Sequence, residues 1–438
     1  MPSADIVVVG AGLAGLTAGL TAVQAGARVQ IFAKGHAATY WGPGGIDIAG
    51  IPAAATARDG IELLAQVPGH PYAFLGGEVE AALDWLRPIL AAEGVDYAGT
   101  LDTALQPVPT SIGGTRRAAI LPAGQAGAIG AWGPGERLVV CGIAGFKDFW
   151  PDAIAASLSR DHVWGESSRP ASVTAVTATL PGLAGRHNLN ALVIGRLFDD
   201  PTWRLEAIDA IAKAVSAARI SGARVALPAV LGIKAHDTVL TELRQRLPGI
   251  SFEMPLVPPS LPGMRLYSAL RSAFMRAGGR IMIGETIERI EHQDGRVTAV
   301  ATTAAARDHV VRTGALILAT GGIAGGGLVA ERDGRLIETV VGLPVEAPPA
   351  DGWLAETAFD PAGHPIERAG VRTDDDLRPV DAAGLVLVDN IRIAGSLLAG
   401  QRYIRERCGD GVAITSGRHA AASLTRVPVG AAESGSVR

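Results

Sequence analysis

The sequence is poor in several features that mark common functional classes. Its 438 residues include two cysteines, Cys141 and Cys408, and no CxxC pair, so neither a metal cluster nor a disulfide framework is expected. Lysine and arginine number 39 against 43 acidic residues, a net charge of -4. Because no basic stripe with interleaved aromatics is present either, we expect no nucleic-acid partner.

Long apolar runs are also missing. No stretch approaches the ~20 consecutive apolar residues that span a bilayer. The N-terminus lacks the basic segment of a signal peptide, and its apolar run Ile6–Val9 leads directly into glycines. The sequence therefore predicts a soluble, cytoplasmic protein in which any membrane contact is peripheral or made through a partner.

Glycine and apolar residues, in contrast, are abundant. The 56 glycines indicate many tight turns and close backbone approaches, which phosphate-binding folds require. Hydrophobic residues make up 48% of the chain, enough for a sizeable core. A length of 438 residues exceeds what one core usually organises, so we expect two domains.

The first functional motif lies at the N-terminus. An apolar strand, residues 5–9, is followed by a Gly-x-Gly-x-x-Gly sequence, a small-residue helix to about residue 25 and a second strand, residues 28–32. In this β-α-β context the glycines permit the tight turn, the close approach of a phosphate and the packing of helix on strand. The motif predicts nucleotide binding by Gly10, Gly12, Leu13, Ala14 and Gly15.

One element of a dinucleotide site is missing. The end of the second strand usually carries an acidic residue that binds the ribose, and here the sequence is Ala33-Lys34-Gly35. NAD is therefore disfavoured as the primary ligand, and Lys34 and Gly35 become candidate contacts for a cofactor phosphate. A glycine-rich loop that follows adds Gly44 and Gly45 as candidates.

Two later segments complete the predicted site. A buried strand, residues 315–319, ends in Thr320-Gly321-Gly322, the usual second contact of flavoproteins with two dinucleotide-binding motifs. A final strand leads into Gly395-Ser396, and a closing helix starts near residue 409. Its N-terminus is expected to stabilise negative charge on a reduced flavin ring. The candidate contacts here are Thr320, Gly321, Gly322, Gly395, Ser396, Asp410, Gly411 and Val412.

With these motifs in place, the chain resembles the B-subunit family of anaerobic glycerol-3-phosphate dehydrogenase, within the Rossmann-type flavoproteins related to succinate dehydrogenase and fumarate reductase. The likeness covers nearly the whole chain, although the family has a pattern closer to Gly-Cys-Gly-Gly-Gly where this sequence has Arg407-Cys408-Gly409-Asp410-Gly411. The stretches that carry it are 10–20, 146–151 (FKDFWP), 227–232 (LPAVLG), 258–263 (PPSLPG), 277–280, 319–322, 326–331, 371–374, 377–379 and 408–411.

The resemblance implies an α/β fold in which a Rossmann-type flavin domain, residues 1–100 and 263–424, is interrupted by an inserted α/β or α+β domain, residues 101–262. Residues 425–438 are expected to form a flexible tail. The resemblance further implies FMN as the bound flavin, with FAD as the alternative. The implied partners are a catalytic FAD subunit and a membrane-associated iron–sulfur subunit, through which electrons from glycerol 3-phosphate reach a quinone.

Other readings stay open at this stage. The chain is alternatively a stand-alone flavin-dependent dehydrogenase or reductase, or an assembly subunit with a vestigial flavin site. The sequence identifies no catalytic acid or base and predicts no set of metal ligands. Anion-binding candidates of lower weight are Lys147, Arg265, Arg402 and Arg405, and Cys408 is expected to be a small buried residue beside the cofactor.

Overall fold

The chain divides into two compact units, which are described separately. Unit 1 comprises Met1–Ala38, Gly60–Leu86 and Leu270–Arg438, and unit 2 comprises Thr39–Asp59 and Arg87–Ala269. Residues 39–59, 87–100 and 263–269, which the sequence analysis assigned to the flavin domain, thus group with unit 2. The predicted tail beyond residue 425 lies outside the described residues. The computed structural model describes residues 3–165, 167–220, 222–247, 249–304 and 307–425.

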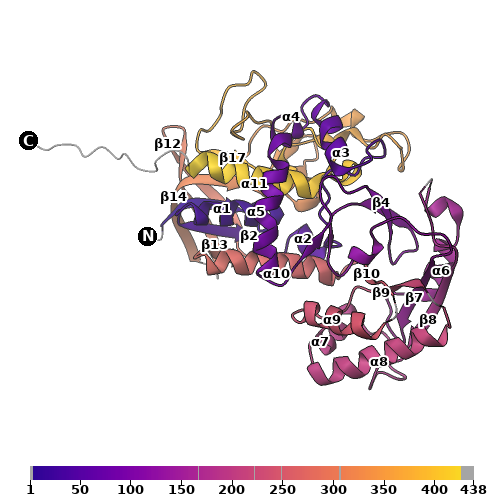
Figure 1. Cartoon of the computed structure of the whole chain (residues 1–438). Coiled ribbons are helices and arrows are strands. Elements are labelled where there is room, and N and C mark those ends of the chain that lie inside the picture. Colours follow the sequence, from indigo (N-terminus) through magenta and orange to yellow (C-terminus); the bar gives the residue numbers. More distant parts are fainter. Residues whose placement is uncertain (1–2, 166, 221, 248, 305–306, 426–438) are drawn as a thin grey trace, which may run out of the picture. The chain divides into compact units, whose positions relative to one another are not determined.

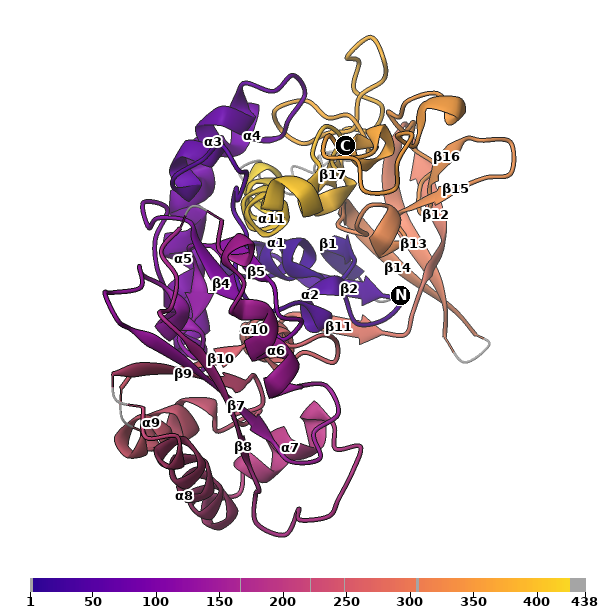
Figure 2. The same cartoon turned by 90° about the vertical axis from the view of Figure 1, so that its right-hand side faces the viewer.

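Unit 1 is built on a mixed sheet, which has seven strands within the described residues. Its strand order is β11-β2-β1-β14-β13-β12, and β17 pairs with β14. The strands β11, β2, β1, β14 and β17 run parallel, whereas β12 and β13 form an antiparallel extension visible in Figure 2. The bounds are β1 Ser3–Val9, β2 Val29–Ala33, β11 Arg280–Ile283, β12 Ile287–Gln293, β13 Arg296–Ala304, β14 Arg307–Leu318 and β17 Ile391–Ile393.

The apolar runs of the sequence explain this sheet. Ile6–Val9 and Leu316–Leu318 are buried, as expected for parallel strands covered on both faces. The hairpin between β12 and β13 turns at Asp294 and Gly295, which both have positive φ, 51° and 74°, as a type I′ turn requires.

Two helices with many small residues pack side by side on unit 1 (Figure 1). They are α1 (Leu13–Gln24) and α11 (Gly409–Thr425). A Cβ atom on Gly417 would overlap the carbonyl oxygen of Ala14, so the two backbones approach closely only because glycine stands at this crossing. The contact joins the first and last helices of the described chain.

Further elements belong to unit 1 or to segments of the chain that run between the two units. Within the described residues, no helix is long and apolar enough to cross a membrane. The remaining elements are α2 Ala38–Trp41, α3 Ala57–Ala65, α4 Tyr72–Leu75, η1 Gly76–Glu78, α5 Val79–Ala91, α10 Leu261–Arg276, η4 Ile323–Gly325, β15 Leu328–Ala330, β16 Leu336–Glu338, η5 Ala350–Gly352, η6 Pro365–Arg368, η7 Gly395–Leu397 and the π-helix η8 Tyr403–Arg407.

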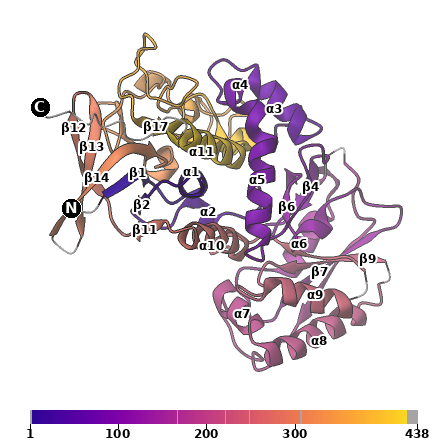
Figure 3. The ribbon, with the colours of Figure 1, turned by 60° about the vertical axis from the view of Figure 1, so that its left-hand side comes forward.

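Unit 2 has its own parallel sheet, with the order β10-β9-β7-β8 (Figure 2), of which Figure 3 shows β7 and β9 from another side. It is therefore an α/β unit, one of the two classes that the resemblance allowed for the inserted domain. Its elements are β3 Tyr97–Ala98, β4 Gln106–Pro109, β5 Thr115–Ala118, β6 Leu121–Pro122, η2 Ala126–Ala128, β7 Arg137–Ile143, α6 Pro151–Leu158, η3 Asp161–Val163, β8 Val173–Ala178, α7 Ala191–Phe198, α8 Pro201–Ala217, β9 Ala223–Pro228, α9 His236–Arg246 and β10 Ser251–Met254.

A buried charge cluster lies within unit 2. The Glu253 carboxylate accepts hydrogen bonds from Arg265 Nη1 and Nη2 at 2.7 and 3.1 Å and from the Leu231 N–H at 2.9 Å. Arg265 also donates from Nη1 to His236 Nε2 at 3.2 Å and from Nε to the Gly232 carbonyl at 3.0 Å. The Arg265 guanidinium is thus engaged in hydrogen bonds within unit 2.

The same cluster predicts an acid-labile unit 2. Burial, reinforced by the Arg265 charge, lowers the pKa of His236 from 6.5 to about 4. A His pKa that is depressed on folding stabilises the protein above pH 6.5, and this contribution is lost as the pH falls toward 4. We expect unfolding titrations between pH 7 and 4 to show a loss of up to about 3 kcal/mol. The variant His236→Asn should flatten this dependence, and an unchanged slope would contradict the assignment.

Candidate cofactor-binding site

Three glycine turns meet at one edge of the unit 1 sheet. The strands β1 and β14 are parallel, with Val9 opposite Leu318, and β14 and β17 are parallel, with Leu318 opposite Ile393. The carboxyl ends of neighbouring parallel strands lie at the same edge, where α/β folds bind their ligands. The turns that follow these three strands are therefore neighbours.

In the first turn, the three glycines have different surroundings. Gly10 has φ +110°, and its added Cβ would overlap the carbonyl oxygen of Ala319. A Cβ on Gly15 would overlap the carbonyl oxygen of Gly10, whereas a Cβ on Gly12 would only reach 3.4 Å from Ala37 Cβ. Gly10 and Gly15 are thus required by the packing of the protein itself, whereas only Ala37 lies near the Cβ position of Gly12.

The second turn is tied to the third. Gly321 has φ +82°, and the Gly322 N–H donates a hydrogen bond of 3.0 Å to Ser396 Oγ. Ser396, a predicted cofactor contact, therefore links two of the turns. The Thr320 Oγ1 atom is buried and has no hydrogen-bond partner within the described structure. A buried hydroxyl without a partner is costly, so Thr320 fits a bound polar group.

The third turn is anchored to α11. Gly395 has φ +72°, its N–H donates 2.9 Å to Ser416 Oγ, and its carbonyl accepts from Gln401 Nε2 at 2.9 Å. An added Cβ on Gly395 would lie 2.9 Å from Ala14 Cβ, in the first turn of α1. The first and third turns are therefore also in contact.

The remaining predicted residues divide between the two units. Lys34 and Gly35 follow β2, whose Phe32 pairs with Val9, so they lie at the same sheet edge as the first turn. Asp410, Gly411 and Val412 form the first turn of α11. Gly44 and Gly45, in contrast, belong to unit 2, where Tyr97 Oη donates 2.6 Å to the Gly44 carbonyl. A cofactor contact by Gly44 and Gly45 stays a prediction.

The chemistry of the assembled residues is that of a binding cradle. The N-cap residue of α1 is Gly12, which has no side chain to cap the helix, and uncapped helix N-termini are common phosphate-binding sites. The residues at these turns offer backbone groups, the hydroxyls of Thr320 and Ser396, the exposed Lys34 amine and the Asp410 carboxylate. This arrangement fits a nucleotide cofactor that supplies its own reactivity.

The comparisons with known proteins decide the family. Residues 5–412 match the family described as FAD binding domain. A protein of Halobacterium salinarum, named as the probable B subunit of an anaerobic glycerol-3-phosphate dehydrogenase, is 30% identical over 433 residues, which cover 94% of this chain and 96% of that protein. This chain belongs to the B-subunit family of anaerobic glycerol-3-phosphate dehydrogenase.

A second relative has the same name, and a solved structure shows a weaker similarity. The B-subunit protein of Yersinia pestis bv. Antiqua is 29% identical over 432 residues, which cover 94% of this chain and 96% of that protein. The 3-ketosteroid delta1-dehydrogenase of Sterolibacterium denitrificans matches 97% of this chain and 100% of its own length, at 11% identity and a TM-score of 0.44. Membership of the B-subunit family, together with the match to the FAD binding domain, makes the chain a flavin-dependent oxidoreductase, as the sequence analysis expected.

The structure gives structural contacts to two arginines that the sequence analysis considered as anion-binding candidates. Arg402 donates to the Ala362 carbonyl, and Arg405 Nη1 donates 3.0 Å to the Pro361 carbonyl, so both arginines hold a loop of unit 1. His70 and Glu406, which the sequence analysis did not single out, are buried beside Cys408. No sequence signal could have paired residues 70 and 406, because their contact is purely tertiary.

Thr320 provides a first test of the cradle. The variant Thr320→Val keeps the shape of the side chain and removes a hydroxyl that has no partner in the described structure. We expect unchanged or slightly higher thermal stability and flavin binding that is about 5- to 30-fold weaker, the loss of one hydrogen bond of about 1–2 kcal/mol. Fluorescence titration of the flavin-free protein measures the affinity. An unchanged affinity would place Thr320 away from the cofactor.

Proposed function

We propose that this chain is the flavoprotein subunit of an anaerobic glycerol-3-phosphate:quinone oxidoreductase. The observation that carries the proposal is the meeting of three glycine turns at one edge of unit 1, with Gly12 open and Thr320 Oγ1 unpartnered. The names of the relatives, which are subunits of anaerobic glycerol-3-phosphate dehydrogenases, supply the substrate.

In this proposal the protein binds and orients the flavin. The backbone at Gly12 and the start of α1 would hold its phosphate, and Lys34 would add a positive charge. Thr320 and the turn at Gly395 would contact the rest of the cofactor. When bound, the flavin supplies the exchange of electrons between a donor and an acceptor. The N-terminus of α11 would favour negative charge on the ring.

The proposal also includes partners. A catalytic FAD subunit would oxidise glycerol 3-phosphate, and a membrane-associated iron–sulfur subunit would pass the electrons to quinone. The chain would then lie in the cytoplasm, at the inner face of the membrane through that subunit. FMN is the proposed cofactor, since Ala33-Lys34-Gly35 lacks the acidic residue that binds an adenosine ribose, and FAD is the alternative.

Purification of the isolated chain tests the cofactor. A yellow protein that releases flavin on denaturation supports the proposal, and the mass of that flavin distinguishes FMN from FAD. A colourless protein that neither FMN nor FAD reconstitutes would overturn it. Co-expression with the two partner subunits tests the role in the complex, because glycerol-3-phosphate-dependent quinone reduction should then require this chain.

A further inference from the structure

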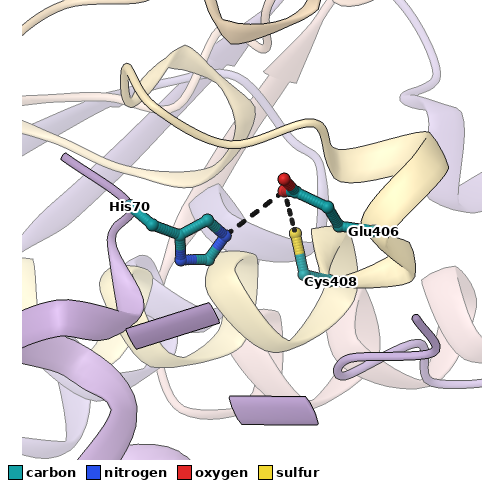
Figure 4. A group of neighbouring side chains, drawn as sticks. All are labelled: His70, Glu406 and Cys408. Carbon is teal, nitrogen blue, oxygen red and sulfur yellow. Dashed lines mark hydrogen bonds and ion pairs between the residues drawn. The ribbon is translucent and has the colours of Figure 1, made fainter. Parts of the chain in front are cut away.

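A buried group of three polar side chains lies just before α11 in unit 1 (Figure 4). Cys408 directly precedes the helix, Glu406 lies in the π-helix η8, and His70 comes from the segment before α4. Their exposed fractions are only 0%, 7% and 1%. Three polar side chains removed from water need a specific arrangement, which their contacts show.

The hydrogen bonds fix the protons of this cluster. His70 Nδ1 accepts the Tyr72 N–H at 3.0 Å and therefore carries no proton. The proton of the neutral ring is then on Nε2, which lies 3.3 Å from Glu406 Oε2. The same oxygen accepts the Cys408 thiol at 3.7 Å and the Arg402 N–H at 2.6 Å.

These donors keep Glu406 ionised. Burial alone would raise the pKa of Glu406, but the bonds from His70 and the Arg402 N–H outweigh burial and lower it. Burial and the Glu406 charge raise the pKa of Cys408 well above its usual value, so Cys408 is a thiol. Arg368 Nη2, 3.6 Å from Glu406 Oε1, is a partly exposed countercharge. The cluster therefore places one fixed negative charge three residues before α11.

The same three side chains resemble a metal-ligand set, but the protons argue against one. A histidine that binds a metal through one ring nitrogen normally donates a proton from the other. Here Nδ1 is an acceptor, so a metal on Nε2 would require a different ring state. The arrangement is that of donors converging on a carboxylate.

We propose that Glu406 is a positioning residue that sets the redox preference of the flavin site through the N-terminus of α11. The inference rests on the proposed flavin site. The positive end of α11 favours the negative charge of a reduced flavin, and an ionised carboxylate at that end opposes the effect. Glu406 therefore holds the flavin at a lower reduction potential than the helix alone would give.

The test compares flavin-loaded variants of the full chain by spectroelectrochemical titration. Glu406→Gln should favour the reduced flavin about tenfold, which is a rise of about 30 mV for a two-electron couple. Arg368→Met removes the countercharge and should shift the potential in the opposite direction. The matched control is Glu78→Gln, which breaks another Glu–His pair on α11, at 2.9 Å from His419, and should leave the potential unchanged.

Two further variants separate charge from packing. His70→Gln removes a member of the cluster but keeps the Glu406 charge, so we expect lower thermal stability without a rise in potential. Glu406→Asp should retain the wild-type potential. A rise in His70→Gln as large as in Glu406→Gln would show that loosening of the cluster is responsible and would overturn the inference. If Glu406→Gln does not fold, the sign of the Arg368→Met shift decides.

The remaining outcomes are distinguishable. If the wild-type chain binds flavin and Glu406→Gln leaves its potential unchanged, the inference fails and the proposed function stands. If the wild-type chain binds no flavin, the proposed function fails. Stoichiometric zinc in the purified chain, lost together with Cys408→Ser, would replace the hydrogen-bonded cluster by a metal site.

Discussion

Replacing Gly12 with alanine is expected to weaken flavin binding by roughly 30-fold or more, about 2 kcal/mol, while unit 1 stays folded. The added Cβ would lie 3.4 Å from Ala37 Cβ, which is an ordinary contact, so the protein itself tolerates it. The loss of a favourable N-cap residue costs about 1 kcal/mol or less. The Cβ would instead occupy the side from which a phosphate approaches. Flavin titration and thermal unfolding of the same sample measure both effects.

Gly15→Ala is the matched variant and should fail differently. Its Cβ would overlap the Gly10 carbonyl oxygen, a backbone atom that cannot move away. We expect a destabilisation of at least about 4 kcal/mol, seen as loss of folded protein. If Gly12→Ala retained full affinity, the cofactor would not approach the first turn. If Gly15→Ala folded normally, the backbone geometry described for this turn would be wrong.

Arg265→Met is expected to destabilise unit 2 by about 3–5 kcal/mol, because it leaves the Glu253 carboxylate buried without its cation. Glu253 is fully buried, and Arg265 binds both of its oxygens. Denaturant unfolding followed by tryptophan fluorescence reports on this unit, since Trp132 and Trp164 are buried in its core.

Two control variants test whether the loss of stability comes from the buried ion pair. Arg58→Met removes an exposed partner of Asp102 and should cost no more than about 1 kcal/mol. The double variant Arg265→Met with Glu253→Leu should regain much of the lost stability, because it removes the buried charge together with its partner. Equal losses in the single and double variants would show that the ion pair is not the cause.

The parts of the site that the sequence predicted are those in which local pattern and physical role coincide. Gly10, Gly12 and Gly15 follow an apolar strand and precede a helix, and Thr320–Gly322 ends a second buried strand, so each turn was recognisable from its neighbours. Their meeting at one edge follows from parallel pairing. The His70–Glu406 pair was not predictable, because its partners are far apart in sequence and neither lies in a motif.

The boundaries of the two units could not be predicted from local sequence patterns either. Residues 39–59 were assigned to the first domain, because the sequence pattern changes only near residue 100, yet they group with residues 87–269. Arg265 was a candidate anion site because it is a cation next to the predicted domain junction. Its use inside the protein depends on Glu253 and on the Gly232 carbonyl, which the fold brings to it.

The pairing of β1 with β14 has a consequence for the order of events on the ribosome. The last segment of unit 2 ends at Ala269, whereas β14, which pairs with β1, ends at Leu318, and β17, which pairs with β14, ends at Ile393. The nascent chain can therefore complete unit 2 while β1 has β2 as a neighbour but still lacks β14. The flavin can then bind only near the end of synthesis. Chains truncated before β14 should fold unit 2 and remain colourless.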